Sequence, residues 1–91
     1  MIQNEQDLVN FNAYPNPIIE QSKFELNDIP SGSNYQDFKA TIYDLNGKIL
    51  FDQSFDSNSI IFQREDAQAG NYIYVISYND TKLRSGKLIL I

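Results

Sequence analysis

Apolar and polar residues alternate with a period of two along much of this chain. Such alternation is typical of strands that bury one face and expose the other. No segment keeps a sustained 3.6-residue period. With turn residues about every 8–12 positions, the pattern predicts an all-β fold, an immunoglobulin-like antiparallel β-sandwich of six to seven short strands. The predicted strands cover residues 8–13, 23–29, 38–45, 48–55, 59–63, 72–78 and 82–91.

The dipeptide Asn46-Gly47 gives the clearest local prediction. It favours a two-residue hairpin turn, because both turn positions take a positive φ. The alternation of the two flanking segments agrees with this register. The predicted cross-strand pairs are Leu45–Lys48, Ile42–Phe51, Phe38–Phe55 and, on the opposite face, Tyr43–Leu50.

A second two-residue turn is predicted at Asn79-Asp80. The strand before it is β-branched and aromatic throughout, which predicts a central position in a sheet. Its tyrosines on one face allow two interpretations, a sandwich core with its rim or a carbohydrate-binding platform. These tyrosines are Tyr72, Tyr74 and Tyr78. The predicted pairs across the second turn are Ile76–Leu83 and Tyr72–Lys87.

The length of 91 residues fits one domain. We expect residues 1–10 to be a linker together with the start of the first strand, and residues 11–91 to be the sandwich, a monomer. The net charge of −5 argues against a nucleic-acid partner, which requires a basic surface. No apolar run approaches the roughly 20 residues that a membrane-spanning helix needs.

The chain contains neither cysteine nor histidine. This excludes thiolate nucleophiles, serine–histidine catalysis and zinc sites built from those residues. Asp44 does not begin a calcium loop, because Gly47 then falls at position 4 and Phe55 at position 12. Glu65 and Asp66 fit a solvated turn. We therefore expect no enzymatic activity, no cofactor and no metal.

The last segment of the chain is unusual because Leu88, Ile89, Leu90 and Ile91 offer apolar groups to both faces of a strand. Edge strands are normally protected by charges or proline. Two arrangements fit this pattern. The strand is central and buried between two neighbours, or it remains partly accessible to a receptor that adds to it or captures its end.

Four short motifs occur in a fixed order along the chain. They are Tyr14-Pro15-Asn16-Pro17, Asp44-Leu45-Asn46-Gly47-Lys48, Ala69-Gly70-Asn71-Tyr72 and Gly86-Lys87. Their order and spacing, from about residue 11 to residue 91, resemble the type A C-terminal sorting domain of type IX secretion substrates in Bacteroidetes. Within these motifs the resemblance assigns a structural role to Tyr14, Pro15, Asn16, Pro17, Asp44, Asn46, Gly47, Lys48, Gly70 and Tyr72.

The resemblance implies a function without chemistry. The domain would follow an N-terminal cargo protein in cis and direct it across the outer membrane, through the periplasm and on to the cell surface or the medium. A translocon or its shuttle would recognise the end of the domain. A cell-surface sortase would then cleave upstream of the fold and join the cargo to lipopolysaccharide. The expected recognition residues are Gly86, Lys87, Leu88, Ile89, Leu90 and Ile91.

The residues themselves leave a second function open. An accessory adhesion or carbohydrate-binding module of a cell-surface protein would have the same immunoglobulin-like fold. It would use tyrosines on an exposed face and need not lie at the end of a chain. Glycan binding in solution that is lost on Tyr→Ala substitution would favour this second function.

Overall fold

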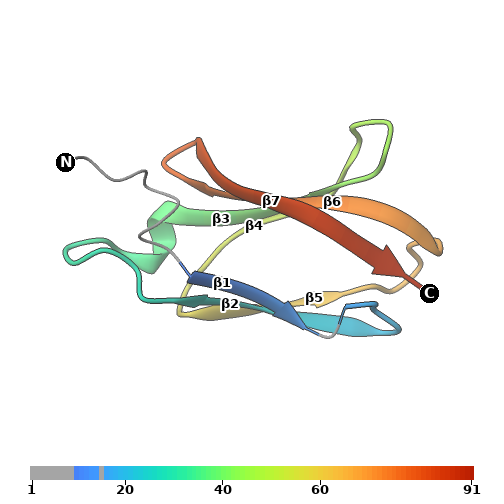
Figure 1. Ribbon diagram of the computed structural model, residues 1–91, viewed down its shortest axis with the longest axis horizontal. Coiled ribbons are helices and arrows are strands. Elements are labelled where there is room, and N and C mark those ends of the chain that lie inside the picture. Colours follow the sequence, from blue (N-terminus) through green and yellow to red (C-terminus); the bar gives the residue numbers. More distant parts are fainter. Residues whose placement is uncertain (1–9, 15) are drawn as a thin grey trace.

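The computed structural model describes residues 10–14 and 16–91, which form seven strands and a short 3-10 helix, η2 (Tyr35–Asp37) (Figure 1). The predicted strand residues Leu8 and Val9, most of the predicted linker and Pro15 lie outside the described residues. The strands are β1 (Asn10–Tyr14), β2 (Gln21–Asn27), β3 (Phe38–Tyr43), β4 (Ile49–Ser54), β5 (Ser59–Gln63), β6 (Gly70–Tyr78) and β7 (Thr81–Leu90).

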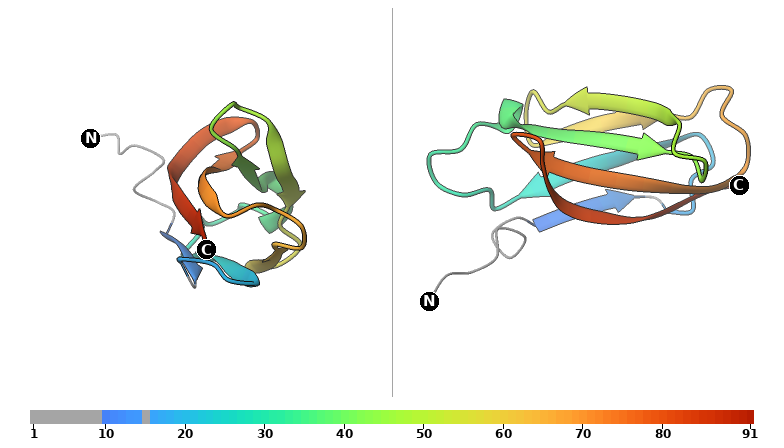
Figure 2. Two further views of the ribbon diagram at one scale, coloured as in Figure 1. Left: turned by 90° about the vertical axis from the view of Figure 1, so that its right-hand side faces the viewer. Right: turned by 90° about the horizontal axis from the view of Figure 1, so that it is seen from above.

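The strands form two antiparallel sheets that pack face to face (Figure 2). The smaller sheet has the order β1-β2-β5, and the larger has the order β4-β3-β6-β7. This arrangement confirms the predicted all-β sandwich. The central position of β6, between β3 and β7, is also confirmed.

The core lies between the sheets and is rich in phenylalanine. Phe24 of β2 stacks on Phe62 of β5, with ring centroids 6.2 Å apart, and Phe51 of β4 meets both rings edge to face. Such aromatic pairs contribute about 0.5–1.5 kcal/mol each beyond area burial. The buried apolar side chains are Ile18, Phe24, Leu26, Phe38, Ala40, Ile42, Phe55, Ile60, Phe62, Tyr72, Ile76, Leu83, Leu88 and Leu90.

The hairpin between β3 and β4 has a different turn from the one predicted. The Asp44 N–H donates to the Lys48 carbonyl (2.9 Å), and the Gly47 N–H donates to the Asp44 carbonyl (3.1 Å). The loop therefore has three residues, and its positive φ is at Gly47 alone (86°). The predicted two-residue turn, with Leu45 opposite Lys48, is wrong. The Asp44 Oδ1 atom accepts from the N–H groups of Asn46 and Lys48, both at 2.9 Å, and this stabilises a type I turn followed by glycine.

The rest of this hairpin follows the predicted register up to one bulge. The predicted contacts that the structure confirms are Ile42–Phe51 and Phe38–Phe55. The bulge lies between Ile42 and Tyr43 and places Tyr43 opposite Ile49. The predicted Tyr43–Leu50 pair is wrong, because the three-residue loop shifts the base of the hairpin.

The turn between β6 and β7 is the predicted two-residue turn, with positive φ at Asn79 (48°) and Asp80 (69°). A bulge in β7 accommodates one additional residue, Leu83, whose side chain is buried in the core. The register therefore shifts by one residue beyond the bulge. The predicted pairs Ile76–Leu83 and Tyr72–Lys87 are wrong, and the observed pairs are Ile76–Arg84 and Tyr72–Leu88.

The tyrosines of β6 face the interior of the sandwich. Tyr72 is buried, and Tyr74 and Tyr78 are partly buried and pack against the core. Tyr74 contacts Phe11 and Tyr78 contacts Phe38, with ring centroids 5.0 and 4.8 Å apart. These side chains therefore form the core and its rim, and they do not offer a flat exposed platform to a carbohydrate.

Candidate recognition site at the end of strand β7

The last strand is neither fully buried nor fully exposed. β7 lies at the edge of the larger sheet and has one strand neighbour, β6, so the interpretation as a central strand between two neighbours is wrong. Leu88 and Leu90 point into the core, with 0% and 2% of their surface exposed. Lys87, Ile89 and Ile91 alternate with them and are exposed, Ile91 at 64%. One row of side chains therefore anchors the strand, and the other row is available for contact.

The outer edge of β7 is covered at its end by residues 16–18, which lie beside it in Figures 1 and 2. The Ile18 N–H donates to the Ile89 carbonyl (2.7 Å), and the Ile91 N–H donates to the Ile18 carbonyl (3.0 Å). This pairing is a parallel bridge between Ile18 and Leu90. Both of these side chains are buried, so Ile18 fixes the end of β7 against the core.

The side chain of Asn16 extends this pairing by two hydrogen bonds. Its Nδ2 donates to the Lys87 carbonyl (3.1 Å), and its Oδ1 accepts from the Ile89 N–H (3.2 Å). A carboxamide has the same donor and acceptor as a peptide group, and here it takes the place of a neighbouring strand. The predicted motif residues Asn16 and Pro17 therefore lie beside the predicted recognition residues.

Arg64, in the turn after β5, holds the same region together. Its Nη1 donates to the Ile19 carbonyl (3.0 Å) and to the Ile91 carbonyl, and its Nε donates to the Ala67 carbonyl (3.0 Å). One guanidinium thus joins three segments that are distant in the sequence. The planar, permanently charged group suits this role because its donors point in fixed directions.

β6 fixes the other side of β7 through two of its motif residues. Gly70 and Tyr72 pair with Leu90 and Leu88, and the Tyr72 hydroxyl donates to the Gln68 carbonyl (2.7 Å). Gly86 lies under the ring of Tyr74. A Cβ atom at this position would come within 2.5–2.6 Å of the ring, so only glycine fits without a shift of the tyrosine.

The remaining motif residues lie elsewhere and support the fold. The Tyr14 hydroxyl donates to a carboxylate oxygen of Glu25 (3.3 Å) on the neighbouring strand. The loop between β3 and β4 contains the other motif residues, Asp44, Asn46, Gly47 and Lys48. Three of the four motifs, at residues 14–17, 69–72 and 86–87, therefore contribute to the end of β7. The fourth, at residues 44–48, closes the hairpin between β3 and β4.

The comparison with protein families agrees with the predicted resemblance. The model of the secretion system C-terminal sorting domain, the Por secretion tail, matches residues 12–91. The chain belongs to this family. Members of this family carry the sorting signal of the type IX secretion system, so a cargo attached in cis and export across the outer membrane are part of what the family does. It is a family of signal domains and not a catalytic one.

The fold of the sorting domain also occurs in a solved structure. PorZ, an essential bacterial surface component of the type-IX secretion system of Porphyromonas gingivalis, superimposes with a TM-score of 0.71 at 14% sequence identity. The match covers 96% of this chain and 12% of PorZ. At this identity the likeness shows a shared fold. A search of curated proteins gave no match.

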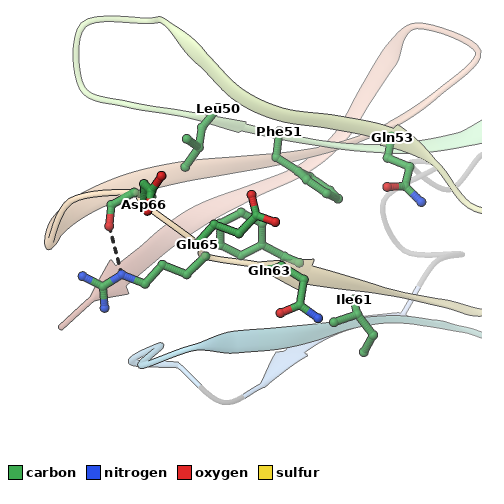
Figure 3. Close-up of a pocket in the computed structure, with 10 residues that line it drawn as sticks. Leu50, Phe51, Gln53, Ile61, Gln63, Glu65 and Asp66 are labelled. Atoms are coloured by element: carbon green, nitrogen blue, oxygen red, sulfur yellow. Dashed lines mark hydrogen bonds between the residues drawn. The ribbon is translucent and has the colours of Figure 1, made fainter.

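The sorting domain has a concave region between β4 and β5, next to the turn that contains Arg64 (Figure 3). This hollow of about 560 Å³ is lined by apolar side chains that include Leu50, Phe51 and Ile61, and by Glu65 and Asp66.

No group of three or more acidic, histidine or cysteine side chains that could hold a metal occurs in the described part of the chain. The residues described contain no helix that could span a membrane.

Two residues of the site were missed by sequence reasoning. Ile18 belongs to a short segment, Pro17-Ile18-Ile19, that shows no strand periodicity, and Arg64 lies between a strand and a polar turn. The contacts that join Asn16 and Arg64 to other segments span 27–73 positions, and hydrophobic periodicity reports only on local geometry. No signal in the single sequence identifies Arg64 as a residue that binds the end of β7.

Proposed function

We propose that the type IX translocon or its shuttle recognises the sorting domain at the folded end of β7, residues 86–91. The observation that carries this proposal is the alternation of side chains there. Leu88 and Leu90 are buried, whereas Ile89 and Ile91 are 38% and 64% exposed. Ile89 and Ile91 are neighbours on one face of the strand, and contiguous exposed apolar groups, unlike scattered single ones, are typical of a contact surface.

The mode of recognition follows from the hydrogen bonds at the outer edge. Strand addition requires free N–H and C=O groups along an edge. Between residues 87 and 91, four of these groups are bonded to Asn16 and Ile18. A receptor therefore reads the outward side chains, unless it first displaces the segment that covers the edge.

The remaining steps of export belong to the same proposal. The cargo precedes the sorting domain in the same polypeptide and passes through the periplasm before it crosses the outer membrane. A sortase then cleaves upstream of the sandwich, near or before residues 1–10, and transfers the cargo to lipopolysaccharide. The sorting domain acts as a monomer and has no enzymatic activity of its own, which is consistent with its lack of cysteine and histidine.

The test is a reporter fusion. A fluorescent protein with an export signal is joined to residues 1–91, and the exported fraction is measured in a type IX-competent strain and in a secretion-deficient strain. Export in the first strain alone is the expected result. Fluorescence that stays in the periplasm of the competent strain would contradict the proposal.

A paired substitution then locates the recognition surface. Ile89→Asn with Ile91→Asn removes exposed apolar groups and leaves Leu88 and Leu90 in the core. Deletion of residues 88–91 is less informative because it also removes core side chains. The matched control is Leu45→Asn with Ile49→Asn. These residues are 69% and 53% exposed, the first in the loop between β3 and β4 and the second in β4, at the opposite edge of the sheet. Only the first pair is expected to abolish export at an unchanged melting temperature.

A further inference from the structure

Two segments that are far apart in the sequence form one apolar surface at the end of the sorting domain. Ile18 and Leu90 pair as a parallel bridge and are both buried. Their neighbours along each segment are exposed. We call these neighbours the terminal apolar surface. They are Pro17, Ile19, Ile89 and Ile91.

Ile19 is the most exposed large apolar residue of this surface, at 67%, and Ile91 is nearly as exposed, at 64%. The same Nη1 atom of Arg64 donates to both of their carbonyl groups, so the two residues lie side by side. Because Arg64 and Ile18 fix both backbones, little conformational freedom is lost when a partner covers the surface.

Charged side chains border the surface with opposite signs on its two sides. Lys87 is exposed on the same side of β7 as Ile89. β7 contains three of the seven basic residues and none of the twelve acidic ones. On the other side, a shallow hollow of about 510 Å³ is lined by Ile19 together with Glu20, Glu65 and Asp66. Arg64 also lines this hollow, so the border is basic at Lys87, and beyond Ile19 three carboxylates lie around one guanidinium.

We infer that the receptor of the type IX system docks on the terminal apolar surface as a whole, so that Ile19 is a recognition residue together with Ile89 and Ile91. The complementary receptor surface is apolar at its centre, with an acidic group opposite Lys87 and a basic group opposite Glu20. This inference rests on the proposed function, since it concerns the same receptor. It extends the recognition site to a segment that precedes β2.

The test compares two isoleucine or leucine positions of nearly equal exposure in the reporter fusion. Ile19→Asn changes the terminal apolar surface, and Leu45→Asn changes a loop residue that is 69% exposed. The exported fraction of the Ile19→Asn fusion should fall about tenfold. This is the loss of receptor affinity expected when most of one isoleucine side chain is no longer buried in the complex. The Leu45→Asn fusion should be exported like the unchanged fusion.

Two further variants separate recognition from folding and test the charged border. Ile19→Leu keeps an apolar side chain, so this fusion should be exported like the unchanged fusion. If position 19 acted only through the conformation of the domain, both Ile19 variants would have a lower melting temperature. Lys87→Glu should lower export several-fold, and Lys48→Glu, which also changes an exposed lysine, should not.

The possible outcomes distinguish this inference from the proposed function. If the unchanged fusion is not exported, the proposed function fails. A different set of results contradicts only the inference: the unchanged fusion is exported, the fusion with Ile89→Asn and Ile91→Asn is retained, and Ile19→Asn is exported normally at an unchanged melting temperature. In that case the receptor contacts β7 alone.

Discussion

The substitution Asn16→Ala tests whether a side-chain amide protects the last strand. Asn16 makes two hydrogen bonds to β7, with the Lys87 carbonyl (3.1 Å) and the Ile89 N–H (3.2 Å). Alanine removes both and leaves the two backbone bonds of Ile18 in place. The end of β7 therefore keeps two of the four hydrogen bonds on its outer edge and loses the other two.

The expected cost follows from these two bonds. A hydrogen bond contributes about 0.5–1.5 kcal/mol net, and both bonds lie at the surface, where water replaces lost partners. We therefore expect the free energy of unfolding to fall by about 1–2 kcal/mol in total. For a domain of this size that corresponds to a melting temperature lower by roughly 5–15 °C.

Thermal unfolding followed by circular dichroism measures the global effect, and amide hydrogen exchange followed by NMR measures the local one. The Ile89 amide should exchange faster in Asn16→Ala, whereas the Ile91 amide, which donates to Ile18, should change less. The control is Asn12→Ala, which removes an exposed side chain from β1. A variant with an unchanged melting temperature and an unchanged Ile89 exchange rate would refute the role of Asn16 as a substitute for a strand.

Two further predictions concern the contacts on either side of this edge. Arg64→Met removes three hydrogen bonds to backbone carbonyls and should lower the free energy of unfolding by about 2 kcal/mol. The control, Lys48→Met, should change it little. Equal denaturant midpoints for the two variants would contradict the role of Arg64. Gly86→Ala places a methyl group against Tyr74 and should cost about 1–3 kcal/mol. In a double-mutant cycle with Tyr74→Ala most of this cost should disappear, and purely additive effects would show that the ring is not its cause.

The hydrogen bonds to the outer edge of β7 also leave fewer backbone groups free to pair with another chain. Exposed strand edges pair readily with other chains, and proteins cover or charge them. In the sorting domain, Asn16 and Ile18 cover the apolar end of the strand, and Lys82, Arg84 and Lys87 place positive charge along the rest. The terminal apolar surface can therefore present side chains to a receptor without offering a template for strand pairing.

The period-two pattern and the turn dipeptides were enough to predict the strands and their antiparallel connections. The pairing of Ile42 with Phe51 followed correctly from the hairpin, because neighbouring strands joined by a short loop have few possible registers. The two bulges were not predictable. Each adds one residue at a small energetic cost, and packing decides its place, as the burial of Leu83 shows.

The candidate site was predicted in part. The segment 86–91 and the motif around Asn16 were both identified from local sequence, but nothing in the sequence placed them side by side. The edge position of β7, the amide bonds of Asn16 and the hydrogen bonds of Arg64 depend on contacts between segments that are distant along the chain. Local periodicity determines which residues form strands and which face is apolar, whereas the packing of the two sheets determines which edge remains open and which groups close it.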